Sequence, residues 1–541
     1  MAGAVTLLLG VLVASVCAED MRQVPLKSVT ALSAVGTVNS ALLDRCNGET
    51  FTGIDVFGTK ILDVVASPVQ NYSTTYMDQT YAGLNFCNVT VTYTHPGRDD
   101  EVHVFATLPL TGWNGRFQGR GGGGFITGVD AAVLAPVTAQ GFAAASTDGG
   151  HALYDQSAES WALNSPGNIN WNLLEDYAYK SLGDMTLIGQ QLTTQFFSKS
   201  PKYSYWTGCS TGGRQGLVFA QRYPDLYDGI LALAPAINLE GFVVAEYYPQ
   251  HVMNRMGHYP LPCELNAIAD AAIKACDSID GVEDGVISLP SICKFDPETL
   301  VGKEFDCDGE KGKFSKEGAV VAKAFWQGPA SPADPEKWYW YGVNRGTPFN
   351  GMAGTTCANA SASSCSGSPF VVSEEYLRLF QQKDPAFVTT NMTDDEYFSM
   401  FHRSAQEYGS MLSTSDPDLS LFKAHGGKMI TWHGLADELI PVNGSSKYYQ
   451  QVMDLDKDVA DYYRYFEAPG VYHCFGGPGP RPEEDETLAA LMAWVENGTV
   501  PETLAARSQT GDGAVRELCL YPQTLVYVGG EPEKSESWGC R

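Results

Sequence analysis

The chain has 541 residues, of which 35 are Lys or Arg and 63 are Asp or Glu, so its formal net charge at pH 7 is −28. This acidic balance argues against a nucleic-acid partner, because phosphate binding requires clustered Lys and Arg. The length allows a large core and more than one domain. We therefore expect a multidomain protein that acts on a small or neutral substrate.

Residues 1–18 have the properties of a signal peptide. An apolar run over residues 5–13 is followed by small residues around a cleavage point after Ala18. The segment lacks a basic residue near its start, but its short apolar run is typical of a signal peptide rather than of a membrane span. No other run approaches the roughly 20 apolar residues that cross a bilayer. The sequence therefore predicts a secreted, extracellular protein without membrane association.

Cysteine and asparagine patterns agree with export. Of the 13 cysteines, Cys17 would leave with the signal peptide, and the even number that remains suits disulfides in an oxidising compartment. The cysteine pairing does not follow from the sequence alone. Asn-x-Ser/Thr sequons favour a glycoprotein. They stand at Asn71, Asn88, Asn359, Asn391, Asn443 and Asn497.

Predicted strands and helices alternate through much of the mature chain. This alternation predicts an α/β fold with a mainly parallel, doubly wound sheet. Strands are expected over residues 88–93, 101–108, 116–119, 141–146, 203–206, 227–234, 428–432 and 462–467. Helices are expected over residues 173–197, 214–223 and 484–497, where apolar residues recur at helical spacing or good helix formers gather.

Residues 208–212 have the sequence Gly-Cys-Ser-Thr-Gly and match a Gly-x-Ser-x-Gly pattern. The pattern alone is weak, since 56 glycines produce such spacings by chance. A strand before it and a helix after it are the setting of a nucleophile elbow, in which a strained turn exposes a serine hydroxyl. Ser210 is therefore the candidate nucleophile.

A dense glycine run at residues 119–125 follows an early strand. It does not match a phosphate loop, because no Gly-Lys-Ser/Thr follows it. In α/β-hydrolases a glycine-rich loop at this place supplies one backbone N–H of the oxyanion hole, and glycine lets the backbone approach the substrate. We assign this role to residues 122–124, and in particular to Gly123. A flexible surface turn is the alternative.

From about residue 238 to residue 415 the pattern changes to helical segments, cysteine-bounded loops and Gly/Ser/Pro-rich stretches. This is far more chain than two βα units need, since each takes roughly 30 residues. We interpret the excess as an inserted domain above the carboxyl edge of the sheet, where it would act as a lid. The predicted domains are a catalytic domain at residues 19–237 and 416–541 and a lid domain at residues 238–415.

Two cysteine-containing dipeptides carry the most specific signal. Cys209 precedes Ser210, and Cys474 follows His473 in a Gly/Pro-rich loop. If the two cysteines are bonded, their Cα atoms lie about 4.4 to 6.8 Å apart, which brings Ser210 and His473 into one small volume. The alternative is that they are unrelated structural cysteines. With Asp437 between them, this pattern of Cys-Ser, Asp and His-Cys resembles the tannase and feruloyl esterase family over nearly the whole mature chain.

The resemblance implies an α/β-hydrolase fold with a large inserted lid and the mechanism of a serine esterase. The order Ser210, Asp437, His473 matches the order Ser, Asp/Glu, His of α/β-hydrolases. His473 would take the proton of Ser210, and Asp437 would orient the imidazole. The backbone N–H groups of Thr211 and Gly123 would bind the oxyanion.

Nine histidines compete for the role of base, among them His433 close to Asp437. A histidine that ends a core strand is more often a packed structural residue, so we favour His473. The resemblance also implies the disulfide pairing. The expected pairs are Cys46–Cys87, Cys209–Cys474, Cys276–Cys293 and Cys519–Cys540. For the other four cysteines, Cys357–Cys365 with Cys263–Cys307 is the chosen pairing, and at this point it stays open.

An acidic loop in the predicted lid suggests a cation site. Three carboxylates at i, i+3 and i+7 around glycines can converge on one cation, and calcium accepts carboxylate and carbonyl oxygens in flexible number. The bidentate Glu of an EF-hand is absent, and no catalytic zinc motif or organic cofactor is indicated. An acidic turn without a metal is the alternative. The resemblance implies a structural Ca²⁺ bound by the side chains of Asp277, Asp280 and Asp284 and by the carbonyls of Val282 and Val286.

The resemblance implies a secreted carboxylesterase that hydrolyses esters of hydroxycinnamic acids, of the feruloyl or p-coumaroyl type, as on plant cell-wall polysaccharides such as xylan. A tannase acting on galloyl esters is the alternative, since fold and triad do not separate the two. A calcium-stabilised extracellular binding protein is the non-enzymatic alternative. Residues 338–341, Trp-Tyr-Trp-Tyr, could form a stacking wall for an aromatic acyl group or the lid's own small core.

Overall fold

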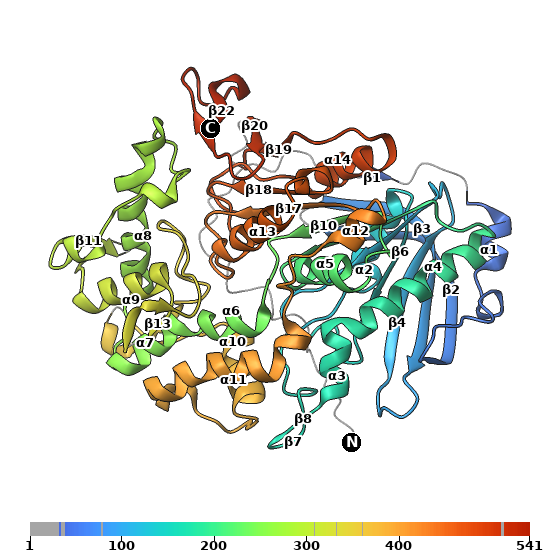
Figure 1. Cartoon of the computed structure of the whole chain (residues 1–541), viewed down its shortest axis with the longest axis horizontal. Coiled ribbons are helices and arrows are strands. Elements are labelled where there is room, and N and C mark those ends of the chain that lie inside the picture. The colour runs from blue at the N-terminus through green and yellow to red at the C-terminus, as the bar shows by residue number, and fades with distance from the viewer. Residues whose placement is uncertain are drawn as a thin grey trace, which may run out of the picture.

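The computed structural model describes residues 32–33, 38–76, 79–307, 309–331, 333–359, 361–509 and 513–541. The predicted signal peptide, residues 1–18, lies outside these ranges. A ten-stranded sheet forms the centre of the fold (Figure 1), in the order β1-β3-β4-β6-β5-β9-β10-β17-β18, with β2 paired to β3. Its strands are β1 (Leu32–Ser33), β2 (Lys60–Tyr76), β3 (Gln79–Thr94), β4 (Val102–Pro109), β5 (Arg116–Arg120), β6 (Ala143–Thr147), β9 (Tyr203–Cys209), β10 (Gly229–Leu233), β17 (Lys428–Gly434) and β18 (Tyr463–Ala468).

The sheet is parallel on one side of β6 and largely antiparallel on the other. Parallel pairs join β6, β5, β9, β10, β17 and β18, whereas antiparallel pairs join β2, β3, β4 and β6. The doubly wound prediction is correct for the parallel part. The long strand β2 is absent from the sequence prediction, because none of its side chains is buried and bulges interrupt its pairing with β3.

Helices cover both faces of the parallel strands, which explains why β10 is apolar and buried at every position. In β9, Trp206 belongs to the core cluster formed with α4 and α5, and Tyr205 belongs to the cluster formed with α2 and α14. In β10, Ile230 and Leu231 alternate between the same two clusters. The helices of this part are α1 (Ser40–Arg45), α2 (Ala131–Ala139), α4 (Ser181–Phe197), α5 (Thr211–Arg222), α12 (Ser420–Ala424), α13 (Asn443–Leu455) and α14 (Glu484–Asn497).

The helix predicted at residues 173–197 is divided in the structure. Its parts are α3 (Trp171–Glu175), a π-helical turn η2 (Asp176–Lys180) and α4. In the turn, the carbonyls of Tyr177 and Ala178 accept hydrogen bonds from the guanidinium of Arg214 at 3.4 and 3.2 Å. Arg214 is fully buried in α5, so the turn packs directly against that helix.

The described chain between β10 and β17 adds no strand to the central sheet. Its helices form a group beside the sheet, coloured green to orange in Figure 1. One part has its own apolar core around Leu265, Phe325 and Phe349, and another part packs with Phe125 and Trp161. These helices are α6 (Leu239–Glu246), α7 (Tyr248–Met256), α8 (Pro262–Cys276), α9 (Lys316–Gln327), α10 (Val371–Glu375) and α11 (Asp394–Leu412). The domain limits at residues 238 and 415 stay a prediction.

Short hairpins complete the fold. The two at the C-terminal end follow α14, and Leu504 and Leu518 of the first pack into the same core cluster as that helix. The paired strands are β7 (Leu163–Ser165) with β8 (Asn168–Ile169), β11 (Glu304–Cys307) with β12 (Glu310–Lys313), β13 (Ala330–Ser331) with β14 (Asp334–Trp338), β15 (Thr355–Cys357) with β16 (Cys365–Gly367), β19 (Thr503–Arg507) with β20 (Val515–Cys519), and β21 (Leu525–Tyr527) with β22 (Trp538–Cys540).

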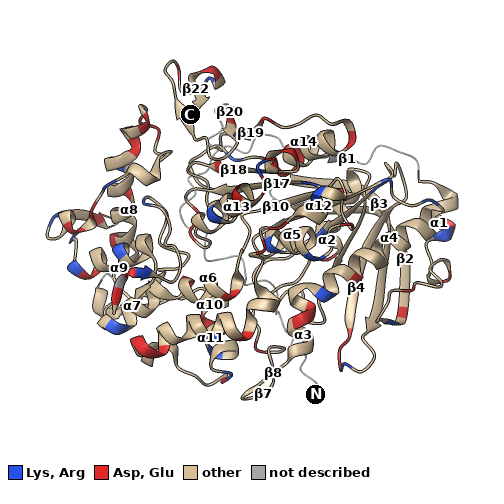
Figure 2. Ribbon diagram, in the orientation of Figure 1, with Lys and Arg blue, Asp and Glu red and all other residues tan. Residues whose placement is uncertain are grey.

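Disulfides close several of these loops, and they join the same cysteines that the family resemblance implied. They are Cys46–Cys87, Cys209–Cys474, Cys263–Cys307, Cys276–Cys293, Cys357–Cys365 and Cys519–Cys540. Figure 2 shows Lys and Arg, in blue, interspersed with Asp and Glu, in red, over the helices rather than gathered on one element. None of the helices in the described ranges combines the length and apolar character of a membrane span.

Candidate active site

The turn between β9 and α5 holds Ser210 in a strained conformation. Its backbone has φ 64° and ψ −123°, in a region that residues other than glycine rarely occupy. Ser210 N donates to Leu233 O at 3.0 Å, and Ser210 O accepts from Ala236 N at 3.0 Å, so the neighbouring strand end fixes the turn. A Cβ atom at Gly208 would lie 2.6 Å from the backbone of Gly212, so the close approach requires glycine. Strand, turn and helix form the arrangement of a nucleophile elbow.

Two loops at neighbouring strand ends carry His473 and Asp437. Nδ1 of His473 lies 2.8 Å from Oδ2 of Asp437, so this nitrogen donates to the carboxylate and Nε2 is left for another partner. Asp437 is buried, and its Oδ1 accepts from the backbone N–H groups of Leu439 and Ile440 at 2.9 and 2.8 Å. The backbone N–H of His473 donates to Oε2 of Glu438 at 3.0 Å. Backbone bonds therefore fix both members of the pair.

Burial and charge act on this pair in opposite directions. Burial alone would raise the pKa of Asp437, but the adjacent His473 and His433 outweigh it and hold this pKa well below its usual range. Burial alone would lower the pKa of His473, but the carboxylates of Asp437 and Glu438 raise it above its ordinary value. An imidazole held on an ionised carboxylate is suited to act as a general base.

The Cys209–Cys474 disulfide joins the serine turn to the histidine loop. Its Cα atoms lie 6.0 Å apart, although the two cysteines are separated by 265 residues in the sequence. Cys209 directly precedes Ser210, and Cys474 directly follows His473. Because each neighbour is only one residue from the bridge, Ser210 and His473 are held in the same small region of the fold.

The glycine-rich loop after β5 lies against the start of α5. Gly212 N donates to Gly122 O at 3.0 Å. A Cβ atom at Gly122 would lie 2.1 Å from Ile126 O, whereas a Cβ atom at Gly123 would meet no atom within 4 Å. Thr211 is the first residue of α5, so its N–H has no acceptor within the helix. Among the described residues, the open space at Gly123 and the absence of an acceptor for Thr211 N–H within α5 suit the oxyanion role assigned to these two residues.

Two hydroxyl groups hold the end of this loop. Oη of Tyr177 and Oγ1 of Thr211 each donate to Gly124 O at 2.8 Å. Tyr177 belongs to η2 and is fully buried, with its ring against those of Phe125 and Trp161. The sequence does not reveal this contact, because Tyr177 is 53 residues away from Gly124.

The sequence of the chain is similar to those of known proteins over most of its length. The family described as tannase and feruloyl esterase matches residues 87–541. The chain belongs to this family. A probable feruloyl esterase from Arthroderma benhamiae is 40% identical over 465 residues, covering 84% of this chain and 86% of that protein. A tannase from Aspergillus oryzae is 30% identical over 576 residues, covering 94% of this chain and 95% of that protein.

A solved structure supports the same conclusion. The tannin acyl hydrolase from Aspergillus niger matches with a TM-score of 0.82 at 28% identity, covering 93% of this chain and 94% of that one. As a member of the tannase and feruloyl esterase family, the protein is a carboxylic ester hydrolase with an α/β-hydrolase fold. Membership in a family of ester hydrolases removes the non-enzymatic alternative.

In this ester hydrolase a second histidine contacts the buried carboxylate. Nε2 of His433 lies 2.9 Å from Oδ2 of Asp437 and 3.1 Å from Ile440 O, and Nδ1 lies 2.9 Å from Oγ of Ser445. The interpretation of His433 as a packed residue is correct about its burial but misses its bond to Asp437. The spacing of four residues between His433 and Asp437 was the available signal.

The acidic loop of the predicted lid presents the oxygen atoms that calcium prefers. Asp277 accepts from the backbone N–H groups of Asp284 and Gly285 at 3.1 and 3.0 Å, and Asp284 pairs with Arg516 at 3.0 Å. Oδ2 of Asp280 is buried and has no hydrogen-bond partner in the described chain. That orphaned oxygen fits a cation, although the three carboxylates do not converge to within 4.8 Å of one another among the described residues.

The aromatic run at residues 338–341 contributes to packing. The ring of Tyr339 lies 5.4 Å from that of Phe398 and 4.7 Å from that of Phe401, both on α11. Trp340 packs against the same cluster, whereas Trp338 is 49% exposed. The structure therefore favours the reading of this run as a small core over that of a stacking wall.

Proposed function

We propose that Ser210, His473 and Asp437 form the catalytic triad of an esterase for hydroxycinnamic acid esters of the feruloyl or p-coumaroyl type. The observation that carries this proposal is the Cys209–Cys474 bridge, because it holds the turn of Ser210 beside the loop of His473. The bond of 2.8 Å between Nδ1 of His473 and Oδ2 of Asp437 supports it further, since it leaves Nε2 to accept the serine proton.

In this mechanism Nε2 of His473 takes the hydroxyl proton while Oγ of Ser210 attacks the ester carbonyl carbon, and Asp437 stabilises the imidazolium. The N–H groups of Gly123 and Thr211 bind the oxyanion, and such a donor is typically worth about 2.7 to 4 kcal/mol. His473 then protonates the leaving alcohol, and the acyl group stays on Ser210. Water that His473 deprotonates attacks this acyl-enzyme, the acid leaves, and Ser210 regains its proton.

The choice of hydroxycinnamoyl esters rests on sequence similarity. The relative named a probable feruloyl esterase is 40% identical, whereas the relative named a tannase is 30% identical. Fold and triad do not discriminate between these activities, which differ in the contacts to the acyl group. We propose a feruloylated plant cell-wall polysaccharide fragment or a small aromatic ester as substrate. Galloyl ester hydrolysis is the second candidate, since the tannin acyl hydrolase structure covers 93% of the chain.

A secreted glycoprotein with a structural calcium fits the remaining features. Disulfides suit an oxidising compartment, and the sequon asparagines other than Asn88 are exposed. Calcium would be held by the side chains of Asp277, Asp280 and Asp284 and by the carbonyls of Val282 and Val286. It would neutralise the carboxylates and fix the loop, without a part in the chemistry.

A serine-directed phosphonate tests the triad. We expect stoichiometric attachment to Ser210, no labelling of Ser210→Ala, and full labelling of Ser399→Ala, which removes an exposed hydroxyl on α11. Labelling of folded Ser210→Ala to the extent of the unmodified enzyme would refute the assignment. Comparing hydrolysis of methyl ferulate, methyl caffeate and methyl gallate then tests the substrate. Preference for gallate would replace the feruloyl proposal and leave the triad intact.

A further inference from the structure

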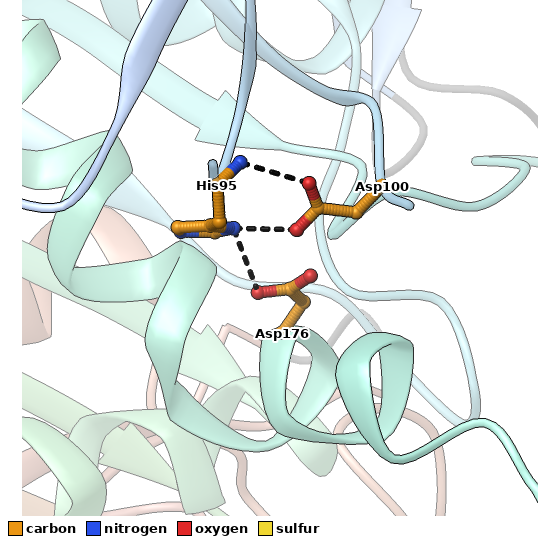
Figure 3. A group of neighbouring side chains, drawn as sticks. All are labelled: His95, Asp100 and Asp176. Atoms are coloured by element: carbon orange, nitrogen blue, oxygen red, sulfur yellow. Dashed lines mark hydrogen bonds and ion pairs between the residues drawn. The ribbon is translucent and has the colours of Figure 1, made fainter. Parts of the chain in front are cut away.

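A buried group of possible metal ligands lies between the sheet and the π-helical turn. Its members are His95, directly after β3, Asp100, in the loop before β4, and Asp176, the first residue of η2. One ligand atom from each lies within 4.8 Å of the others, and all three residues are buried (Figure 3). Across the described ranges this is the one group of three or more His, Cys, Asp or Glu residues that meets this distance.

Hydrogen bonds orient two of these side chains. Oδ1 of Asp100 accepts from the backbone N–H of His95 and from Oγ1 of Thr94, both at 2.8 Å, which turns Oδ2 toward Nδ1 of His95 at 2.5 Å. On the other side of the ring, Nε2 of His95 lies 2.9 Å from Oδ2 of Asp184, a carboxylate that Lys180 binds. A histidine whose second nitrogen is held by a carboxylate is the usual arrangement around a metal-ligating imidazole.

Asp176 lacks the partners that a buried carboxylate needs. Its side chain is fully buried, and neither oxygen has a hydrogen-bond partner among the described residues. Figure 3 shows this carboxylate directed at the ring of His95, where Oδ1 lies 3.7 Å from Nδ1. The ring of Tyr93 packs against His95, and its buried hydroxyl also has no hydrogen-bond partner within the described part of the chain. Such unsatisfied groups are rare in native structures and call for an unseen ligand or proton.

The ion pairs around His95, Asp100 and Asp176 leave negative charge that a divalent cation would balance. Arg98 pairs with Glu175 and Lys180 pairs with Asp184, so these four charges cancel. Among the described residues, neither Asp100 nor Asp176 forms an ion pair with a Lys or Arg, and both contact His95. Their two negative charges equal the charge of one divalent ion bound to a neutral imidazole.

We propose that Nδ1 of His95, Oδ2 of Asp100 and Oδ1 of Asp176 bind a divalent cation of the Zn²⁺ class. One imidazole and two carboxylates suit this class, whereas an all-oxygen set would suit calcium or magnesium. Bond lengths of about 2.0 to 2.2 Å separate tetrahedral ligand atoms by about 3.3 Å. The distance of 3.7 Å between Nδ1 of His95 and Oδ1 of Asp176 is close to this value. Oδ2 of Asp100 would move away from Nδ1 of His95, because the ion would replace the hydrogen bond between these two atoms.

The ion would join the β3–β4 turn to η2. That turn of helix carries Tyr177, which holds Gly124, and Ala178, which accepts from Arg214 of α5. Because the bound ion would touch none of the reacting groups, its expected effect is on the stability of the fold. The site therefore differs in place, donor set and metal class from the calcium loop.

Zinc binding to the full-length protein tests the proposal. After removal of bound metals and addition of calcium, we expect isothermal titration with ZnCl₂ to show one ion per chain and Tm to rise by several degrees. The ion should survive gel filtration and be detected by elemental analysis. No uptake, or uptake without a change in Tm, would overturn the proposal.

Asp176→Asn is the informative variant. The side-chain amide of Asn has nearly the size and shape of the carboxyl group of Asp176, but it offers no negatively charged oxygen to a divalent cation. We expect this variant to fold, to match the metal-free Tm of the unmodified protein, and to bind zinc at least about 100-fold more weakly. His95→Gln serves as a second variant. His103→Gln, which removes a partly exposed histidine paired with Asp148, should bind zinc normally. Normal binding by Asp176→Asn and His95→Gln would refute the site.

Discussion

His433 and His473 share one acceptor, because both rings bond to Oδ2 of Asp437, at 2.9 and 2.8 Å. His433 approaches from the end of β17 and His473 from the loop after β18. Donation from His433 stabilises the ionised form of Asp437. A carboxylate that is already stabilised in this way attracts the proton of His473 less strongly, so His433 sets the basicity of the proposed catalytic pair.

The first prediction concerns His433→Gln. We expect kcat to fall about tenfold, equivalent to about 1.4 kcal/mol, because Asp437 loses a bond that fixes its orientation. The acid limb of the pH profile of kcat/KM should move to higher pH, since the freed carboxylate holds the imidazolium proton of His473 more tightly. Ser445→Ala is the matched control, because it removes only the bond to the other ring nitrogen. An unchanged pH profile for His433→Gln would show that His433 only fills space.

The second prediction concerns the pH dependence of the unmodified enzyme. The pKa of His473 is raised above its ordinary value of 6.5. The proposed base must be neutral, so kcat/KM should fall as pH drops through this raised pKa, and the acid limb should lie above pH 6.5. Glu438→Gln removes one of the negative charges that raise this pKa and should shift the limb to lower pH. A limb below 6.5 in the unmodified enzyme would contradict the assignment of His473.

The third prediction concerns the bridge between Cys209 and Cys474. Replacing both cysteines with serine opens a loop of 265 residues, which costs on the order of 5 to 6 kcal/mol at most in the chain-entropy description. We expect kcat/KM to fall about 100-fold at temperatures where the variant is folded, because the base is no longer held near Ser210. Serine replacement of Cys46 and Cys87 should lower Tm but leave kcat/KM nearly unchanged. Equal activity losses in the two folded variants would argue against a positional role.

The fourth prediction separates two adjacent glycines. Gly123→Ala should leave Tm nearly unchanged, because its Cβ atom would meet no atom of the described residues within 4 Å. It should lower kcat/KM at least about tenfold by filling space that the substrate needs. Gly122→Ala should lower Tm, because its Cβ atom would lie 2.1 Å from Ile126 O. Measuring Tm and ester hydrolysis for both variants tests the assignment. Full activity of Gly123→Ala would place the oxyanion elsewhere.

The fifth prediction concerns the acidic loop of the lid. A chelator selective for calcium should lower Tm and leave the initial rate at room temperature unchanged, because the proposed ion is structural. Asp280→Asn should remove this response, since the orphaned oxygen of Asp280 is the donor with no other partner. Asp296→Asn is the control, as its carboxylate lies on the exposed side of a nearby loop and pairs with Lys323. If the chelator leaves Tm unchanged, the calcium proposal is refuted.

The sequence predicts the parts of the fold that local signals determine. The parallel strand β10 is a continuous apolar run because helices cover both faces, and the turn at Ser210 has glycines where backbones nearly touch. The dipeptides of Cys209 and Cys474 carry long-range information, because a covalent bond converts two local patterns into one contact. These signals were enough to recognise the family and its ester hydrolase activity.

Other features depend on contacts that leave no local pattern. Strand β2 has no buried side chain, so its alternation is weak. The π-helical turn has no sequence pattern of its own, and its contacts, such as the hydrogen bonds that its carbonyls accept from Arg214, become visible only in the structure. The group of His95, Asp100 and Asp176 comes from two segments far apart in the chain, and neither segment contains a recognised metal motif.

The π-helical turn η2 contains one residue more than an α-helical turn, and its carbonyls bind a side chain of α5, the helix that follows Ser210. The guanidinium of Arg214, four residues after Ser210, ends on the carbonyls of Tyr177 and Ala178. Deleting one residue from η2 would restore a regular α-helix and rotate these carbonyls away from α5. The guanidinium of Arg214 would then be buried without these acceptors, which destabilises the fold. The π-helical turn therefore helps to fix the position of α5. Its loss would make the turn at Ser210 less rigid, although every residue of the proposed triad would be unchanged.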